Sequence, residues 1–137
     1  RQFDSATAME SALKLKEVSY MHSESFPAGE LKHGPIALLD PKTLVVAIAS
    51  NPDLYDKIGS NMVEVRARAA TVLVITQDDS GAFTGKTDEI FKIPTCSDTL
   101  ASLLTVIPAQ LFAYYCAIQR GYDPDKPRNL AKSVTVE

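Results

Sequence analysis

The chain has 137 residues, 45% of them hydrophobic, and a net charge of −3 at pH 7. This length and composition suit one globular domain with its own core. Without a basic excess, nothing indicates a nucleic acid or an anionic membrane as partner. The longest apolar runs, such as Leu44 to Ala49, are too short to span a bilayer, and no signal-peptide pattern opens the chain, so we expect a soluble, cytoplasmic domain.

The two cysteines, Cys96 and Cys116, have neither the spacing of a metal site nor that of a disulfide framework. Both lie among apolar residues, which favours small core side chains over reactive thiols. The chain also has no metal-ligand spacing and no glycine-rich phosphate loop, so the sequence predicts no metal and no cofactor.

The first half of the chain predicts two helices and one strand. Residues 6–25 are rich in helix formers and indicate a helix, whereas residues 27–35 contain two prolines and two glycines and indicate a loop or broken turn. Residues 43–50 form a continuous apolar run, typical of a strand covered on both faces. Asn51 starts a second helix that runs to about Ala69.

The second half predicts two more strands and a long helix. Residues 71–76 indicate a buried strand, residues 77–88 a loop and residues 89–93 a shorter strand. Residues 97–120 form a mostly apolar helix, and residues 122–137 an irregular tail. This alternation predicts an α/β three-layer sandwich with a mostly parallel sheet flanked by helices. Because the chain opens on a helix, we expect its first strand to be missing.

Three charged residues line one face of the first predicted helix. Glu10, Lys14 and Glu17 are spaced at i, i+4 and i+7, and apolar side chains border them. A buried stripe of this kind must be paired and has shifted pKa values. The alternative is a solvated ladder, which contributes a few tenths of a kcal/mol, about 0.2–0.5 per pair.

A histidine and a lysine complete the set of candidate reactive groups. His33 lies in the Gly/Pro-rich segment, from which it could exchange protons near neutral pH. Lys132 lies in the tail among small and apolar neighbours, which could lower its pKa and make it a Schiff-base nucleophile. Each of the two is, taken alone, also compatible with an inert surface position. Together with the carboxylates they suit carbonyl and enediol chemistry.

Three strings carry a resemblance to a known family: ESALKLKEVSY (10–20), AGELKHGP (28–35) and PRNLAKSVTVE (127–137). In this order they resemble the second sugar-isomerase (SIS) domain of the glucosamine-6-phosphate synthases, and the resemblance runs the whole chain. It implies a flavodoxin- or Rossmann-like fold, with residues 1–137 as one C-terminal SIS domain and residues 122–137 as its catalytic tail.

The resemblance also implies a reaction, which converts fructose 6-phosphate and glutamine-derived ammonia to glucosamine 6-phosphate. By this resemblance Lys132 forms a Schiff base with the open-chain ketose, Glu17 moves the proton between C1 and C2, and His33 opens the sugar ring of the neighbouring subunit in a homodimer. The supporting residues of the site are Glu10, Lys14 and Ala131.

The chain departs from the family pattern in two ways. Ser11 replaces a usual glycine and Ser5-Ala6 a usual Tyr-Pro, but neither change removes a catalytic group. More important, neither the glutaminase domain with its N-terminal cysteine nor the first SIS domain with its Ser/Thr phosphate cradle is present in the sequence. We therefore expect the isolated chain to be inactive.

Two function classes remain open. One is a catalytic half-site that works inside the whole enzyme, and the other is a non-catalytic SIS module that binds a sugar phosphate or drives dimerisation. The combination of Glu17, His33 and Lys132 favours the first, because a binding module does not need an imine-forming lysine.

Overall fold

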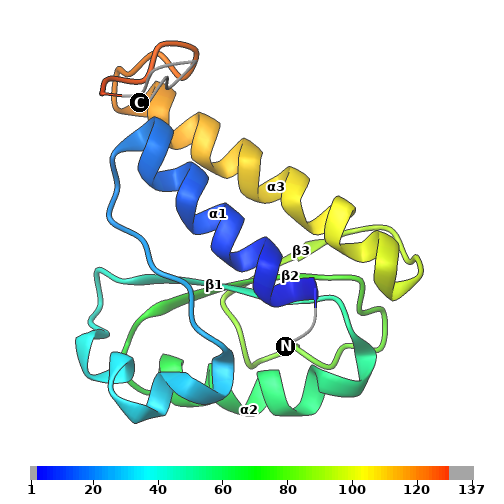
Figure 1. Cartoon of the computed structure of the whole chain (residues 1–137). Coiled ribbons are helices and arrows are strands. Elements are labelled where there is room, and N and C mark those ends of the chain that lie inside the picture. The colour runs from blue at the N-terminus through cyan, green and yellow to red at the C-terminus, as the bar shows by residue number, and fades with distance from the viewer. Residues whose placement is uncertain (1–2, 130–137) are drawn as a thin grey trace, which may run out of the picture.

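The sheet at the centre of the molecule has three parallel strands. The computed structural model describes residues 3–129, and in it the strands follow one another in the order β1-β2-β3 (Figure 1). Both pairings are parallel. The strands are β1 (Leu44–Ala49), β2 (Thr71–Thr76) and β3 (Glu89–Lys92). All three predicted strands are thus confirmed, within a residue at each end.

Helices cover both faces of the sheet, so the predicted three-layer α/β sandwich is confirmed. Figure 1 shows α1 (Phe3–Ser19) and α3 (Asp98–Gln119) side by side on one face. The other face carries α2 (Tyr55–Arg66) and the short 3-10 helices between α1 and β1. These short helices are η1 (Ala28–His33) and η2 (Pro35–Leu38), and a third, η3 (Pro52–Leu54), leads into α2.

The main core lies between the sheet and α2. Val72 and Val74 of β2 are fully buried and meet Met62 and Val65 of α2 in one cluster. The alternation of a strand explains this, because every second side chain of β2 points to the same face. Leu31 of η1 packs against the same cluster, so η1 belongs to the α2 layer.

Helices α1 and α3 pack closely because α3 presents small side chains to α1. Its buried residues recur every fourth position and form one stripe: Ala101, Thr105, Ala109, Ala113 and Ala117. Small side chains at this spacing let two helix backbones approach each other. The pair therefore forms one packed layer over the sheet.

The first helix ends earlier than predicted. The sequence predicts a helix over residues 6–25, whereas α1 ends at Ser19. Tyr20 has a left-handed backbone with φ of +57°, which a helix cannot continue. This bend brings the Tyr20 ring 4.7 Å from the ring of Tyr122 in an edge-to-face contact. A tertiary contact thus overrides the helix propensity of the residues that follow.

The other predicted helices are confirmed, with one refinement. The Asn51 side chain accepts a hydrogen bond from the Asp53 N–H at 2.9 Å, as expected of a helix start. The segment predicted as a loop at residues 27–35 contains η1 and most of η2. Gly34 separates these two turns with φ of +153°, a conformation that L side chains rarely adopt.

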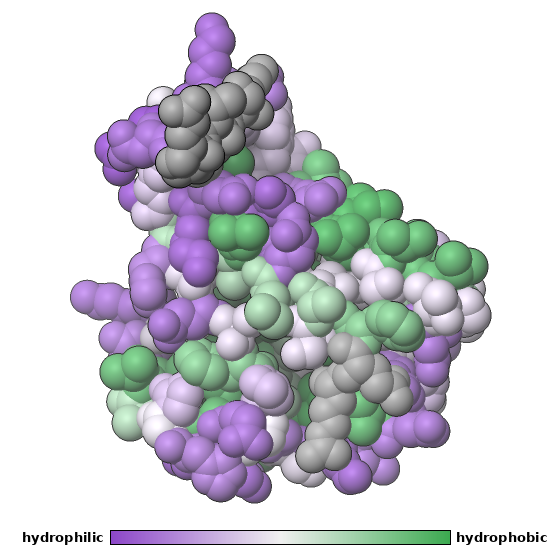
Figure 2. All heavy atoms as spheres, viewed as in Figure 1, coloured by the Kyte–Doolittle hydropathy of each residue, from purple (hydrophilic) through white to green (hydrophobic). Residues whose placement is uncertain are grey.

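Helix α3 corrects the expectation about membrane-spanning stretches. Its 22 residues are long and apolar enough to cross a membrane by length and composition, although none of its uninterrupted apolar runs is. Figure 2 shows apolar side chains along the outer side of this helix. Leu103, Ile107 and Leu111 of α3 are exposed. In this structure the opposite side of α3 packs on α1.

Candidate functional site

The charged face of α1 forms a carboxylate–ammonium–carboxylate group. The Lys14 Nζ lies 2.7 Å from an oxygen of Glu17 and 3.6 Å from an oxygen of Glu10. The three side chains are 35%, 26% and 41% exposed, respectively, so the group is partly shielded from water. The face is therefore neither the fully buried stripe nor the freely solvated ladder that the sequence left open.

Lys14 remains an ammonium ion in this arrangement. The hydrogen bond to Glu17 is the largest cause that raises the pKa of Lys14 above its ordinary value, and it outweighs the opposing effect of burial. A protonated amine is no nucleophile at neutral pH. Lys14 can hold and orient Glu17, but it cannot form an imine without first losing its proton.

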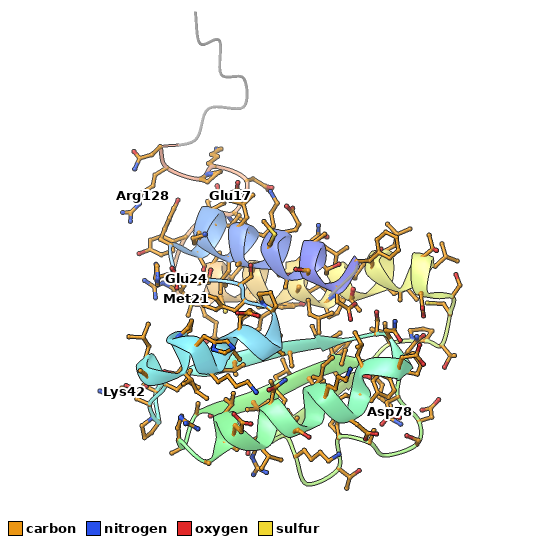
Figure 3. All side chains as sticks on the ribbon, turned by 60° about the horizontal axis from the view of Figure 1, so that its bottom comes forward. Glu17, Met21, Glu24, Lys42, Asp78 and Arg128 are labelled. Carbon is orange, nitrogen blue, oxygen red and sulfur yellow. The ribbon has the colours of Figure 1, made fainter. Side chains whose placement is uncertain are left out.

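The end of the described chain returns to the end of α1. The backbone N–H of Arg128 donates a hydrogen bond of 2.7 Å to the hydroxyl of Tyr20, which follows Glu17 by three residues. Figure 3 shows Glu17 and Arg128 at the same end of the molecule. The structure thus brings the base of the tail close to the charged face. The predicted site residues Ala131 and Lys132 lie outside the described residues.

His33 lies far from this group within one chain. It is exposed at the end of η1, which belongs to the α2 layer, whereas Glu17 lies on the opposite side of the sheet (Figure 1). The chain therefore does not bring His33 and Glu17 together by itself. The second histidine, His22, lies beyond the end of α1 at Ser19 and is exposed.

A cleft opens at the carboxyl ends of the strands, where open parallel sheets usually bind ligands. Among the described residues, its lining contains no lysine, arginine or histidine but four aspartates: Asp56, Asp78, Asp79 and Asp98. A phosphate dianion would meet like charges there. Figure 3 shows Asp78 at the opposite end of the molecule from Glu17, so cleft and charged face are separate.

The loop after β2 has already used the backbone groups that could hold a phosphate. One carboxylate oxygen of Asp78 accepts from the N–H and the hydroxyl of Ser80, and the other accepts from the N–H of Ala82. Burial by itself would raise the pKa of Asp78, but these hydrogen bonds together lower it below its usual value. The Asp78 carboxylate thus binds the N–H groups that a phosphate would need in this loop.

A buried polar network at the same edge was missed by the sequence analysis. The Asp4 carboxylate accepts from the Ser50 N–H at 3.1 Å and from the Ser50 hydroxyl at 2.5 Å, which ties the start of α1 to the end of β1. Gln77 donates to the Ser50 carbonyl and accepts from the Cys96 N–H. The available signal was the polar residue that directly follows β1 and β2, Ser50 and Gln77.

The two cysteines have structural surroundings. Both are partly buried, and burial raises the pKa of the Cys116 thiol, which disfavours the reactive thiolate. Within residues 3–129, no group of three or more His, Cys, Asp or Glu side chains could hold a metal ion.

Comparison with known families accounts for this arrangement of helices and strands. Residues 4–120 match the family described as SIS domain. The chain belongs to this family. The SIS domain match covers every helix and strand of the structure except the first residue of α1.

Curated relatives resemble the SIS domain over all or nearly all of its length. The glutamine–fructose-6-phosphate aminotransferase (isomerizing) of Caldanaerobacter subterraneus is 51% identical over 137 residues, which is 100% of this chain and 22% of the relative. The protein of the same name from Pseudomonas putida is 52% identical over 130 residues, or 95% of this chain and 21% of the relative. The chain thus spans about a fifth of these relatives.

Solved structures give the same picture. The C-terminal domain of glucosamine-fructose-6-phosphate aminotransferase from Francisella tularensis has a TM-score of 0.82 at 40% identity, covering 89% of this chain and 34% of that one. A glucosamine-6-phosphate deaminase from Thermotoga maritima has a TM-score of 0.75 at 33% identity, covering 95% and 37% of the two chains.

Proposed function

We propose that this SIS domain forms part of the isomerase site of a glucosamine-6-phosphate synthase, which makes glucosamine 6-phosphate from fructose 6-phosphate and glutamine-derived ammonia. The aminotransferase relatives, about 50% identical along the whole chain, support this proposal. The main structural support for the proposal is the Glu10–Lys14–Glu17 group, which lies near the start of the tail that contains Lys132.

The chemistry needs a base and an electron sink. Glu17 takes the proton from one of the two sugar carbons, C1 or C2, and returns it to the other, while the carbon–nitrogen double bond takes up the electron pair. Lys14 lies against the Glu17 carboxylate and fixes its orientation. The longer contact to Glu10 balances the charge of Lys14 from the other side.

Lys132 supplies the imine. Its Nζ attacks the ketose carbonyl carbon C2, water leaves, and the resulting imine can pass to ammonia. Lys14 is unsuited to this step, because its hydrogen bond to Glu17 raises its pKa. His33 opens the sugar ring of the partner subunit in a homodimer, because within one chain it lies in the layer opposite to Glu17.

The phosphate is held by another part of the full-length polypeptide. The cleft of this domain is acidic, and the Asp78 carboxylate occupies the N–H groups of its loop. We therefore assign the phosphate cradle to a first SIS domain and ammonia production to a glutaminase domain, both in the remaining four-fifths of the relatives' length. We expect the whole enzyme to be cytoplasmic.

The deciding experiment is Glu17→Gln in the full-length protein. Isomerisation of fructose 6-phosphate should fall by about 10²–10⁴-fold, the usual contribution of a positioned acid–base group, while glutamine hydrolysis persists. Glu24→Gln serves as the matched control, because Glu24 is an exposed carboxylate beyond the end of α1. Retention of more than about a tenth of the isomerase activity would contradict the role of Glu17 and favour a non-catalytic binding module.

A further inference from the structure

Three side chains join the ends of α1 and α3 to the base of the tail. The Arg128 guanidinium carbon lies 4.2 Å from the ring centre of Tyr20 and 5.9 Å from that of Tyr122. The two rings meet edge to face at 4.7 Å. We call Tyr20, Tyr122 and Arg128 the tail clamp. Both the ring and the hydroxyl of Tyr20 take part, since the hydroxyl also accepts from the Arg128 N–H.

The two tyrosines of the tail clamp are each held by the helix that they follow. Tyr20 leaves α1 with a left-handed backbone, and its N–H still donates to the Lys16 carbonyl. Tyr122 follows the end of α3, where its N–H donates to the Ala117 carbonyl at 3.0 Å. This pattern closes a helix and fixes the residue that follows it. The clamp therefore stands on two packed helices rather than on a free loop.

The clamp limits where the reactive lysine can go. Lys132 follows Arg128 by four residues, so its Cα stays within about 14 Å of that of Arg128. Glu17 lies in the last turn of α1, three residues before Tyr20. Asn129, the last described residue, has a left-handed φ of +61°, which asparagine tolerates better than most residues.

We propose that the tail clamp is a positioning device that holds the base of the tail so that Lys132 meets the sugar above Glu17. This inference rests on the proposed function and assigns three further residues to positioning rather than to the chemical step. Without the clamp the tail would search a larger volume, and the lysine would reach the ketose carbon in a smaller fraction of encounters.

The test uses the full-length protein and borohydride trapping of the imine with fructose 6-phosphate. Arg128→Ala removes the cation over both rings but keeps the backbone N–H, whereas Tyr20→Leu removes the ring and the hydroxyl. Each variant should lower the trapping rate at Lys132 by about tenfold. Because sugar binding is untouched, kcat should fall more than KM changes. Arg128→Lys keeps the cation over the ring and should restore part of the rate.

Three comparisons separate positioning from stability. Lys126→Ala, in the same segment, is the matched control and should trap at the wild-type rate. The double variant should be no slower than the slower single variant, because both changes break one unit. If Tyr20→Leu does not fold, Tyr20→Phe removes only the hydroxyl that Arg128 binds and should slow trapping by a smaller factor.

The outcomes distinguish the two proposals. If wild-type protein traps at Lys132 and the clamp variants trap equally fast, the inference is wrong and the proposed function stands. An unchanged trapping rate with a lower melting temperature would reduce the clamp to a purely structural role and also contradict the inference. If borohydride modifies no residue at position 132 of the wild-type protein, both proposals are wrong.

Discussion

The ammonium group of Lys14 lies against the Glu17 carboxylate at 2.7 Å, one turn before α1 ends. Their hydrogen bond is the main cause that raises the pKa of Lys14. Because the pKa of Lys14 is higher in the folded than in the unfolded chain, the ion pair stabilises the fold fully below the unfolded pKa, which is about 10. This stabilisation is lost only as the pH rises through the higher folded pKa. The pair is therefore intact over the whole physiological range.

Replacement of Lys14 should impair catalysis more than stability. In Lys14→Met the Glu17 carboxylate loses the partner that orients it, so we expect isomerase activity to fall by about tenfold or more, as for a displaced acid–base group. Lys16→Met is the control, because Lys16 is exposed and its side chain makes no hydrogen bond or ion pair with any residue between 3 and 129. Equal activities of the two variants would contradict the orienting role. The measurement is steady-state conversion of fructose 6-phosphate by the full-length protein.

Mixed dimers test whether His33 acts across subunits. His33→Ala and Lys132→Ala full-length proteins should each be inactive. After subunit exchange, the mixture should recover about a quarter of the wild-type activity, and purified mixed dimers about a half. The reason is that one site of each mixed dimer then receives an intact histidine and an intact lysine. If subunit exchange is proven by mass and activity stays absent, His33 acts within its own chain or not at all.

Removal of the Asp4 carboxylate should destabilise the fold. Asp4 is 7% exposed and accepts two hydrogen bonds from Ser50, so Asp4→Ala leaves a buried N–H and a hydroxyl without their acceptor. We expect a loss of about 1–3 kcal/mol in the free energy of unfolding. Glu64→Ala on the exposed side of α2 should cost less than about 0.5 kcal/mol. The measurement is the urea unfolding midpoint of the two variants, and equal midpoints would refute the stabilising role of Asp4.

The stability contribution of Asp78 should depend on pH. Its pKa is lowered in the fold, so its contribution is present above the unfolded value near pH 4 and is lost as the pH falls through the folded value. Asp78→Asn should therefore be less stable than wild type at pH 7 by about 1–3 kcal/mol. The difference should shrink at acid pH. Urea unfolding at several pH values measures it, and a constant difference would contradict the mechanism.

The isolated chain should not turn over fructose 6-phosphate. Its cleft is acidic and its Asp78 loop is closed to anions, so the sugar loses the anchor that aligns C1 and C2 with Glu17. Such positioning contributes several kcal/mol of barrier, about 7–11 in well-oriented systems. Isomerisation to glucose 6-phosphate by the purified 137-residue chain is the measurement. A turnover number comparable to that of the intact enzyme would mean that a phosphate cradle lies within this chain.

The sequence by itself determined the layers and the charged face. The apolar runs predicted β1 and β2 as strands inside the layered fold, although Leu44 and Val46 of β1 remain exposed. The helical spacing of Glu10, Lys14 and Glu17 put them on one face. These features depend on residues close together in the chain, so their periodicity can be recognised from the sequence alone. The end of the first helix was misplaced because the residues after Ser19 have no glycine or proline to announce it.

Only the tertiary structure decided which distant groups meet. The contact of Tyr20 with Tyr122 and Arg128 joins residues about a hundred positions apart, and no local pattern encodes it. The same holds for the bond of Asp4 to Ser50, which exists because the sheet places the end of β1 beneath the start of α1. The separation of His33 from Glu17 also follows from packing, since Leu31 anchors η1 in the core on the side of α2.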